Sequence, residues 1–256
     1  PQTEPHAKCV DLIVQKMKSY QLEVLIPGGE VTAYNGKKIK LKNVIASYKP
    51  ELSKRILIAG HFDTRPMADR DTHNTEKPID AASDGASQVA IMFEIARHVS
   101  QADLKIGIDF IFFDMEDYGD KYCQGSEYWA NHPHKKNYSA QYGILLDIVG
   151  AKGATFPIEG YSRQYAYSVV RKVWDKAAEL GYSDYFMYNE IQEITDDHYN
   201  INSILNIPTI DIIHTDPYTG DIGPGFHHRH ADNMSIIDKN TLKAVGQTVL
   251  EVIYSE

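Results

Sequence analysis

Cysteine, long apolar runs and basic charge are all scarce in this sequence, and each scarcity narrows its possible roles. No apolar stretch approaches the roughly 20 residues that a membrane-spanning helix requires, so no transmembrane segment is expected. Lysine and arginine total 26 against 35 acidic residues, the net charge is −9, and no basic run is present. This balance argues against nucleic acid as a partner. The two cysteines, Cys9 and Cys123, could pair or stay free, and the sequence leaves both possibilities open.

The chain also lacks internal repeats, low-complexity tracts and linker-like stretches. With 256 residues, 43% of them hydrophobic and 24% charged, it has the composition of a soluble globular protein with ample material for a core. We therefore expect a single domain over residues 1–256, of unknown oligomeric state. The sequence starts at Pro1 with neither an initiator methionine nor a signal peptide, so we expect that a preceding segment has been removed.

Hydrophobic periodicity and turn residues divide the chain into helices and strands. Helices are expected at residues 6–20, 84–99, 125–131, 162–180 and 238–255. Strands are expected at residues 22–26, 30–34, 38–48, 55–60, 105–113, 142–150 and 208–214. The first three strands indicate an antiparallel meander, and residues 61–83 form a long loop. Ser83 is the expected N-cap of the helix that follows, with Val89, Phe93 and Ala96 facing the core.

Strands that alternate with helices predict an α/β fold in three layers. The central sheet should be mixed but mostly parallel, with an antiparallel edge and with helices on both faces. In open sheets of this kind, ligands bind just beyond the carboxyl ends of the parallel strands. Side chains that follow those strand ends are therefore the first candidates for a functional site.

Acidic side chains gather directly after one buried strand, in the stretch DFIFFDMEDYGD at residues 109–120. Like charges at this density repel, and a bound cation is the simplest compensation. Similar side chains follow other strands or lie in nearby loops: His61, Asp63, Asp84, Asp147, Asp196, Asp197, His198, His227, His228 and His230. Carboxylates and imidazoles without a thiolate suit zinc in a catalytic site, where three protein ligands leave a position open.

Several of these residues also have a purely structural interpretation. Asp84 could stabilise a helix N-terminus through the helix dipole. Asp109 could be an edge or hydrogen-bonded residue, and the HHRH run could be a surface loop. The loop acids Asp69, Asp71, Asp114 and Asp120 are expected to be solvated. Asp147 should be partly buried and therefore needs a partner. Taken together, the residues favour a metal site.

Five segments resemble, in order, the motifs of the zinc aminopeptidase superfamily: AGHFDTRP, ASDGASQVA, FFDMEDYG, LLDIVGA and HHRHADN. The similarity covers residues 55–235. Within the superfamily the chain is most similar to the animal-type glutaminyl cyclases and especially to their bacterial relatives. LLDIVGAKGATFP, the acid Asp196 in TDDHYNI, and the run that ends in HHRHADN carry this narrower resemblance.

The resemblance implies a site with one zinc per chain, bound by Asp84, Asp117 and His228. Glu116 would be the general acid/base, with Asp147 and Asp196 as a hydrogen-bonded catalytic pair beside it. The remaining site residues would contact substrate: Thr195 and His227. The sequence departs from the family at two of these positions, because Asp117 replaces Glu and His227 replaces Trp.

The implied reaction is cyclisation of the N-terminal glutamine of peptides and proteins to pyroglutamate, with release of ammonia. The implied location is the periplasm or the exterior of the cell. Two other interpretations stay open. A two-zinc aminopeptidase would use the same residues together with His61, with Glu116 activating a water molecule. A non-catalytic binding domain would normally lose ligands, and this chain keeps all of them.

Overall fold

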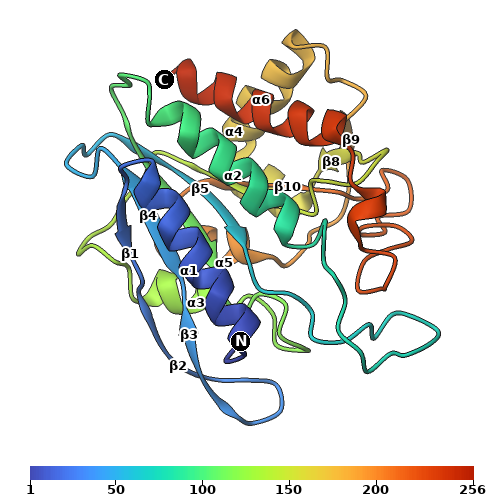
Figure 1. Ribbon diagram of the computed structural model, residues 1–256. Helices are drawn as coiled ribbons and strands as arrows, with labels where there is room; N and C mark the ends of the chain where they lie inside the picture. Colours follow the sequence, from blue (N-terminus) through green and yellow to red (C-terminus); the bar gives the residue numbers. More distant parts are fainter.

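A six-stranded mixed sheet forms the centre of the computed structural model, which describes residues 1–256 (Figure 1). Its strands run in the order β1-β4-β6-β5-β7-β10. Their bounds are β1 Glu23–Leu25, β4 Val44–Tyr48, β5 Arg55–His61, β6 Gly107–Phe113, β7 Gly143–Asp147 and β10 Thr209–Ile213. The last four strands of the order are parallel to one another, whereas β4 and β1 pair antiparallel at one edge. The predicted mostly parallel sheet with an antiparallel edge is confirmed.

Helices cover both faces of this sheet and complete the three predicted layers. One face carries α1 Glu4–Ser19, α2 Ala86–Val99, α4 Gly160–Glu179 and α6 Lys239–Tyr254. The other face carries α3 Gln124–Asn131 and α5 Asp197–Leu205. A short 3-10 helix, Met234–Ile236, precedes α6. None of the helices is long and apolar enough to cross a membrane.

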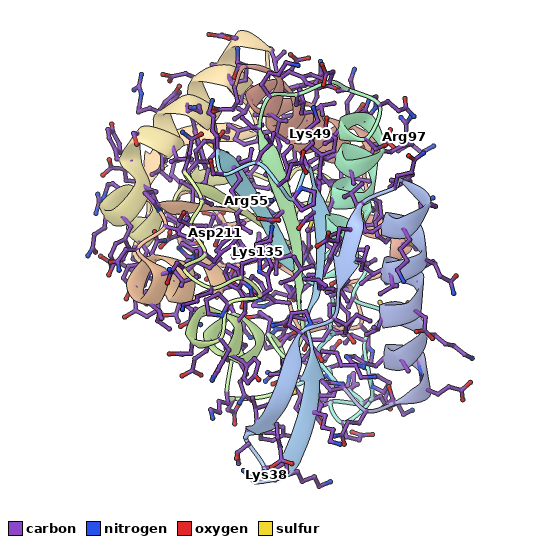
Figure 2. All side chains as sticks on the ribbon, turned by 90° about the vertical axis from the view of Figure 1, so that its left-hand side faces the viewer. Lys38, Lys49, Arg55, Arg97, Lys135 and Asp211 are labelled. Atoms are coloured by element: carbon purple, nitrogen blue, oxygen red, sulfur yellow. The ribbon has the colours of Figure 1, made fainter.

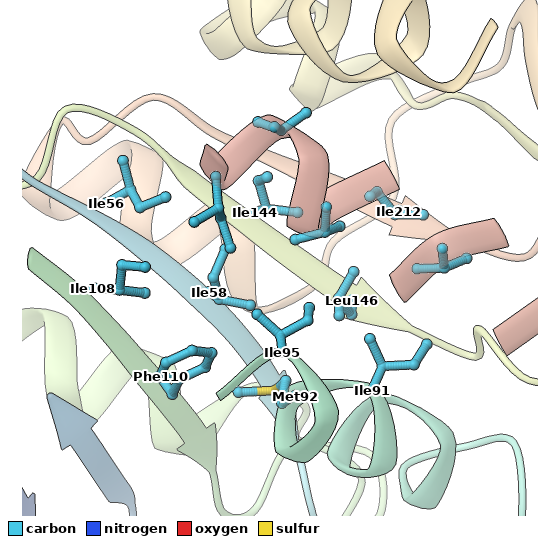
Figure 3. Close-up of a cluster of buried hydrophobic side chains, with 14 of the residues drawn as sticks. Ile56, Ile58, Ile91, Met92, Ile95, Ile108, Phe110, Ile144, Leu146 and Ile212 are labelled. Atoms are coloured by element: carbon cyan, nitrogen blue, oxygen red, sulfur yellow. The ribbon is translucent and has the colours of Figure 1, made fainter. Parts of the chain in front are cut away.

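Burial on both faces explains why the parallel strands are almost continuously apolar. Successive side chains of a strand point to opposite faces, so Ile56 and Ile58 of β5 join the core beneath α2, while Leu57 joins the core beneath α3. Figure 3 shows the first of these contacts, with Met92 and Ile95 of α2 against the sheet. The sheet is therefore a rigid base from which the loops at its carboxyl edge are positioned.

The antiparallel region differs from the predicted meander. Only β2 Gly28–Thr32 and β3 Lys38–Lys42 pair as a hairpin, in a separate two-stranded sheet, while β1 pairs with β4. Strand β2 begins at Gly28, two residues before the predicted start at residue 30. Glycine fits there because a Cβ would lie 2.1 Å from the carbonyl oxygen of Leu41. Figure 2 shows Lys38 at the far end of this hairpin.

Other element boundaries also differ from the prediction. The N-cap of α2 is Gly85, not Ser83, because the backbone N–H groups of Ser83 and Asp84 both donate to the carboxylate of Asp232. Of the residues expected to face the core from this helix, Ala96 is buried and the other two are partly buried. Helix α4 begins two residues earlier than predicted, with Glu159 as its N-cap. Two short parallel strands, β8 Phe156–Ile158 and β9 Phe186–Glu190, were not predicted.

The structure also shows the state of both cysteines and the burial of Asp109 and Asp114. Both cysteines are free, Cys9 partly buried and Cys123 buried. Asp109 is no edge residue: it is buried in the central strand β6 and accepts hydrogen bonds from Arg55 Nε at 2.5 Å and Nη2 at 2.8 Å. Asp114 is not solvated either. It is fully buried and accepts from the backbone N–H of Lys42 at 2.8 Å, because the β3–β4 region packs over it.

Candidate active site

The carboxyl ends of β5, β6, β7 and β10 border a cavity of about 320 Å³. Two long loops lie on this side of the molecule: one joins β5 to α2, the other joins β10 to α6 (Figure 1). All eight residues that the sequence assigned to the site line the cavity: Asp84, Glu116, Asp117, Asp147, Thr195, Asp196, His227 and His228. A larger, mostly apolar cavity of about 660 Å³ lies between α2 and α6, but no group of potential metal ligands borders it.

The three predicted metal ligands come from separate loops: His228 lies near both acids, but Asp117 forms no compact group with Asp84 and His228. His228 Nε2 lies 3.1 Å from Asp117 Oδ1 and 3.8 Å from Asp84 Oδ2. All three side chains are buried, and one oxygen of each carboxylate, Oδ2, has no hydrogen-bond partner. His228 adopts a left-handed backbone conformation, with φ of 57°, that is uncommon for a non-glycine residue. Backbone strain of this type is typical of functional sites.

Asp63 holds the acidic loop in place. Its Oδ1 accepts the backbone N–H of Glu116 at 3.0 Å, and its Oδ2 accepts that of Asp117 at 3.2 Å. The preceding residue, Met115, has a positive φ of 58°, which turns the chain sharply after β6. One buried carboxylate therefore fixes the backbone of both acids that follow this strand.

Glu116 lies against the inner wall of the cavity. Its Oε1 is 3.5 Å from the thiol sulfur of Cys123, and its Oε2 is 4.0 Å from His61 Nδ1. Burial, together with the neighbouring carboxylates of Asp117 and Asp196, raises the pKa of Glu116 well above its usual value. A raised pKa makes the carboxylate a stronger base, as a group that takes up and returns a proton requires.

Asp147 ends β7 and finds the partner that its burial requires. Its Oδ1 lies 3.0 Å from His61 Nε2 and accepts from Gln88 Nε2 at 3.1 Å. Burial raises the pKa of Asp147 to about 7, although the hydrogen bond to His61 opposes this rise. The next residue, Ile148, has a φ of 52°, which strains a β-branched side chain. The end of β7 is thus held in a fixed and strained conformation.

The predicted hydrogen bond between Asp147 and Asp196 is not formed. His61 and Gln88 contact the carboxylate of Asp147 instead. Asp196 caps α5 through its Oδ1, and its Oδ2 has no hydrogen-bond partner. Deeper in the protein, Asp196 belongs to a buried group with His198 and Asp211. His198 forms a 2.9 Å hydrogen bond with Glu159, so the inner side of this group supports α4 and α5, while Asp196 itself also lines the cavity.

His227 and Arg70 both line the cavity, Arg70 with an exposed side chain and His227 with a partly buried one. Arg70 Nη1 donates to His227 Nδ1 at 2.7 Å. Because a guanidinium only donates, Nδ1 must be unprotonated and Nε2 must carry the hydrogen. Burial lowers the pKa of His227 to about 3, so the ring is neutral. His230, by contrast, turns away from the cavity toward Asn74.

Sequence patterns did not reveal two residues that support the site. Arg65 is buried and ion-paired to Asp69, with its Nη1 3.5 Å from Asp117 Oδ1. Asp232, in the quoted HADN motif, accepts the backbone N–H of Asp84 at 3.1 Å and so fixes that residue. The pattern of acids and imidazoles after strands could not find them, because Arg65 is a cation and Asp232 lies far beyond the end of β10. The exposed Asp69 reaches within 3.6 Å of His228 Nδ1 and is therefore more than a solvated loop acid.

The donor set fits zinc. In a tetrahedral zinc site with metal–ligand distances near 2.0 Å, ligand atoms are about 3.3 Å apart, which is close to the separations around His228. Two compact groups of possible ligands share Asp84. One contains Asp84, His227 and His228, and the other contains His61, Asp84 and Asp147. Oxygen and imidazole donors with unpartnered buried oxygens are suited to a divalent cation.

Comparison with known proteins agrees with these motifs. The model of peptidase family M28 matches residues 43–253. Aminopeptidase YwaD of Bacillus subtilis (strain 168) is 24% identical over 224 residues, 83% of this chain, and this chain spans only 44% of its length. Glutaminyl cyclase of Porphyromonas gingivalis matches with a TM-score of 0.97 and 43% identity, over 100% of this chain and 91% of the other.

A second solved glutaminyl cyclase gives the same result. The enzyme of Bacteroides thetaiotaomicron, bound to N-acetylhistamine, matches with a TM-score of 0.96 and 46% identity, over 100% of this chain and 91% of the other. Other similar structures carry the names of zinc-dependent exopeptidases or of an aminopeptidase. The resemblance inferred from the five motifs is thereby confirmed. The chain belongs to peptidase family M28 and, within that family, resembles the bacterial glutaminyl cyclases.

Proposed function

We propose that the protein is a zinc-dependent glutaminyl-peptide cyclotransferase. In this reaction the free α-amine of an N-terminal glutamine attacks its own γ-amide carbon; a ring C–N bond forms, the bond to the amide nitrogen breaks, and ammonia leaves. The observation that carries the proposal is the similarity to glutaminyl cyclases along the whole chain. In this chain Glu116 and Asp196 line the same cavity as the three candidate zinc ligands. Because the attack is intramolecular, much of the entropic barrier is already removed.

Asp84, Asp117 and His228 would hold one zinc ion per chain. Bound there, the ion would act as a Lewis acid that polarises the γ-carbonyl group of the substrate. His227 is not included, because Arg70 fixes its hydrogen on Nε2, the nitrogen that faces Asp84 at 3.6 Å. A protonated nitrogen has no lone pair to offer a metal.

Glu116 would carry the proton. Asp63 fixes its backbone, and burial raises the pKa of its carboxyl group, which makes the ionised carboxylate a stronger base. It would accept a proton from the attacking amine and return one to the leaving nitrogen, a contribution typically worth about 10²–10⁴-fold in rate.

Asp147 and Asp196 would accept hydrogen bonds from the amine and amide N–H groups of the substrate. Asp196 Oδ2 is buried without a partner on the cavity wall and is therefore available. Thr195 and His227, which also line the cavity, would contact the substrate. The substrates would be peptides and proteins that begin with glutamine, and the enzyme would act in the periplasm or outside the cell.

A two-zinc aminopeptidase is the second candidate. The group formed by His61, Asp84 and Asp147 shares Asp84 with the first group, as a pair of neighbouring ions would require. The similarity of the chain to aminopeptidase YwaD also favours this alternative.

Ammonia release from Gln-initiated peptides tests the proposal. The purified protein should release one ammonia per peptide, lose this activity after chelation and regain it with zinc. Elemental analysis should return one zinc per chain. Two zinc ions per chain, with one lost in His61→Ala, together with no ammonia release, would establish the aminopeptidase instead.

A further inference from the structure

One cation lines the candidate active-site cavity, and it is unpaired. The acids on the wall are Asp84, Glu116, Asp117, Asp147, Glu193 and Asp196, and Arg70 is the single lysine or arginine among the lining residues. Arg70 is exposed and lies within 4.0 Å of no carboxylate. Arg65, in the same loop, is by contrast buried and bound to Asp69 and Asp117. The charge of Arg70 is thus free to act on a molecule in the cavity mouth.

The structure holds Arg70 at this position from two directions. Its backbone N–H donates to the carbonyl oxygen of His228 at 3.4 Å, and its Nη1 donates to His227 Nδ1 at 2.7 Å. One of the five guanidinium N–H groups is used in this way, and no other hydrogen bond of that side chain is formed. The other four N–H groups are left for a ligand, and because His227 already holds the side chain, less entropy is lost when they bind a carboxylate.

The residue that follows the N-terminal glutamine must pass this mouth, if the proposed function holds. With the glutamine side chain and amine bound beside the buried Asp84, Asp117 and Glu116, the rest of the peptide would leave past the exposed lining residues, Arg70 among them. We propose that Arg70 is a specificity-determining residue that favours substrates with Asp or Glu directly after the N-terminal glutamine. Glu193 lines the same cavity, but its carboxylate is exposed and makes no hydrogen bond, so it is held less firmly.

Three matched peptides measure this preference: Gln-Glu-Ala-amide, its neutral isostere Gln-Gln-Ala-amide, and Gln-Lys-Ala-amide. The kcat/KM ratio of the Glu peptide to the neutral peptide should be about two- to fivefold in the unmodified enzyme, the size expected of an exposed ion pair. The ratio should fall toward one in Arg70→Gln, persist in Arg70→Lys, and shrink as salt is raised. Glu193→Gln should increase it.

The ratio of the kcat/KM values for two substrates does not change when part of the enzyme is inactive. Damage to His227 or to zinc binding would therefore not imitate the effect. Arg97→Gln is the matched control, because it removes the same charge near the C-terminus of α2, away from the cavity (Figure 2). Arg97 pairs with Glu94 there, and its replacement should leave the ratio unchanged. Cyclisation of all three peptides with a ratio that Arg70→Gln does not alter would overturn the inference alone. Failure of every Gln-peptide to cyclise would overturn the proposed function, and this inference with it.

Discussion

Replacement of Asp63 by Asn tests whether one buried carboxylate positions the catalytic loop. Asp63 uses both oxygens, at 3.0 Å to the N–H of Glu116 and at 3.2 Å to that of Asp117. Asparagine has nearly the same shape but only one acceptor oxygen, and its amide group would confront the second N–H. One hydrogen bond to a charged group is worth about 1.5–3 kcal/mol, and more is lost when a buried donor stays unpaired.

Because each 1.36 kcal/mol changes a rate tenfold, the variant should lose roughly ten- to hundredfold in kcat/KM. Steady-state ammonia release from a Gln-peptide measures this loss, and thermal unfolding should show a lowered Tm. Asp80→Asn is the control, since Asp80 is an exposed acid of the same loop without a hydrogen bond to its carboxylate. If Asp63→Asn kept a kcat/KM within twofold of Asp80→Asn, the loop would not depend on Asp63.

Three further changes test other parts of the structure. Glu116→Gln should bind zinc and fold but lose about 10²–10⁴-fold in kcat, and near-normal turnover would exclude Glu116 as the proton carrier. Asp196→Ser should sharply lower cyclisation, because it removes the buried Oδ2 that we propose accepts a substrate N–H; unchanged activity would remove Asp196 from the mechanism. Asp109→Asn should cost about 3–5 kcal/mol of unfolding free energy near neutral pH, because it leaves the Arg55 guanidinium buried without its counter-charge. Although Asp109 is buried, its hydrogen bonds to Arg55 and other neighbours lower its pKa. The stabilisation by Asp109 is therefore present above the usual carboxyl pKa and disappears as the pH falls below about 4. Urea unfolding that shows the same difference between the unmodified protein and Asp109→Asn at all pH values would contradict this.

Much of the fold could be predicted because burial leaves a direct pattern in the sequence. The parallel strands are buried on both faces and appear as apolar runs such as Ile56–Ala59, and acids that follow them must lie at one edge of the sheet. The positions of Glu116, Asp117 and Asp147 could therefore be inferred without coordinates.

Features that depend on contacts between distant segments could not be inferred. Asp114 looks like a loop acid, yet it is buried because Lys42 and His6 reach it from segments 72 and 108 residues away. Asp232 caps the backbone before α2 from 148 residues downstream, which displaced the predicted helix start. The expected pairing of Asp147 with Asp196 was wrong for the same reason, because Asp147 is hydrogen-bonded to Gln88 and His61 instead.

An equimolar mixture of a Gln-initiated and a Leu-initiated peptide, incubated with the purified protein and followed by mass spectrometry, tests the proposed activity most directly. The Gln peptide should lose the mass of one ammonia while the Leu peptide stays intact, and Glu116→Gln should suppress the change. Rapid release of free leucine from the second peptide, with the first unchanged or shortened by hydrolysis, would contradict cyclisation and establish an aminopeptidase.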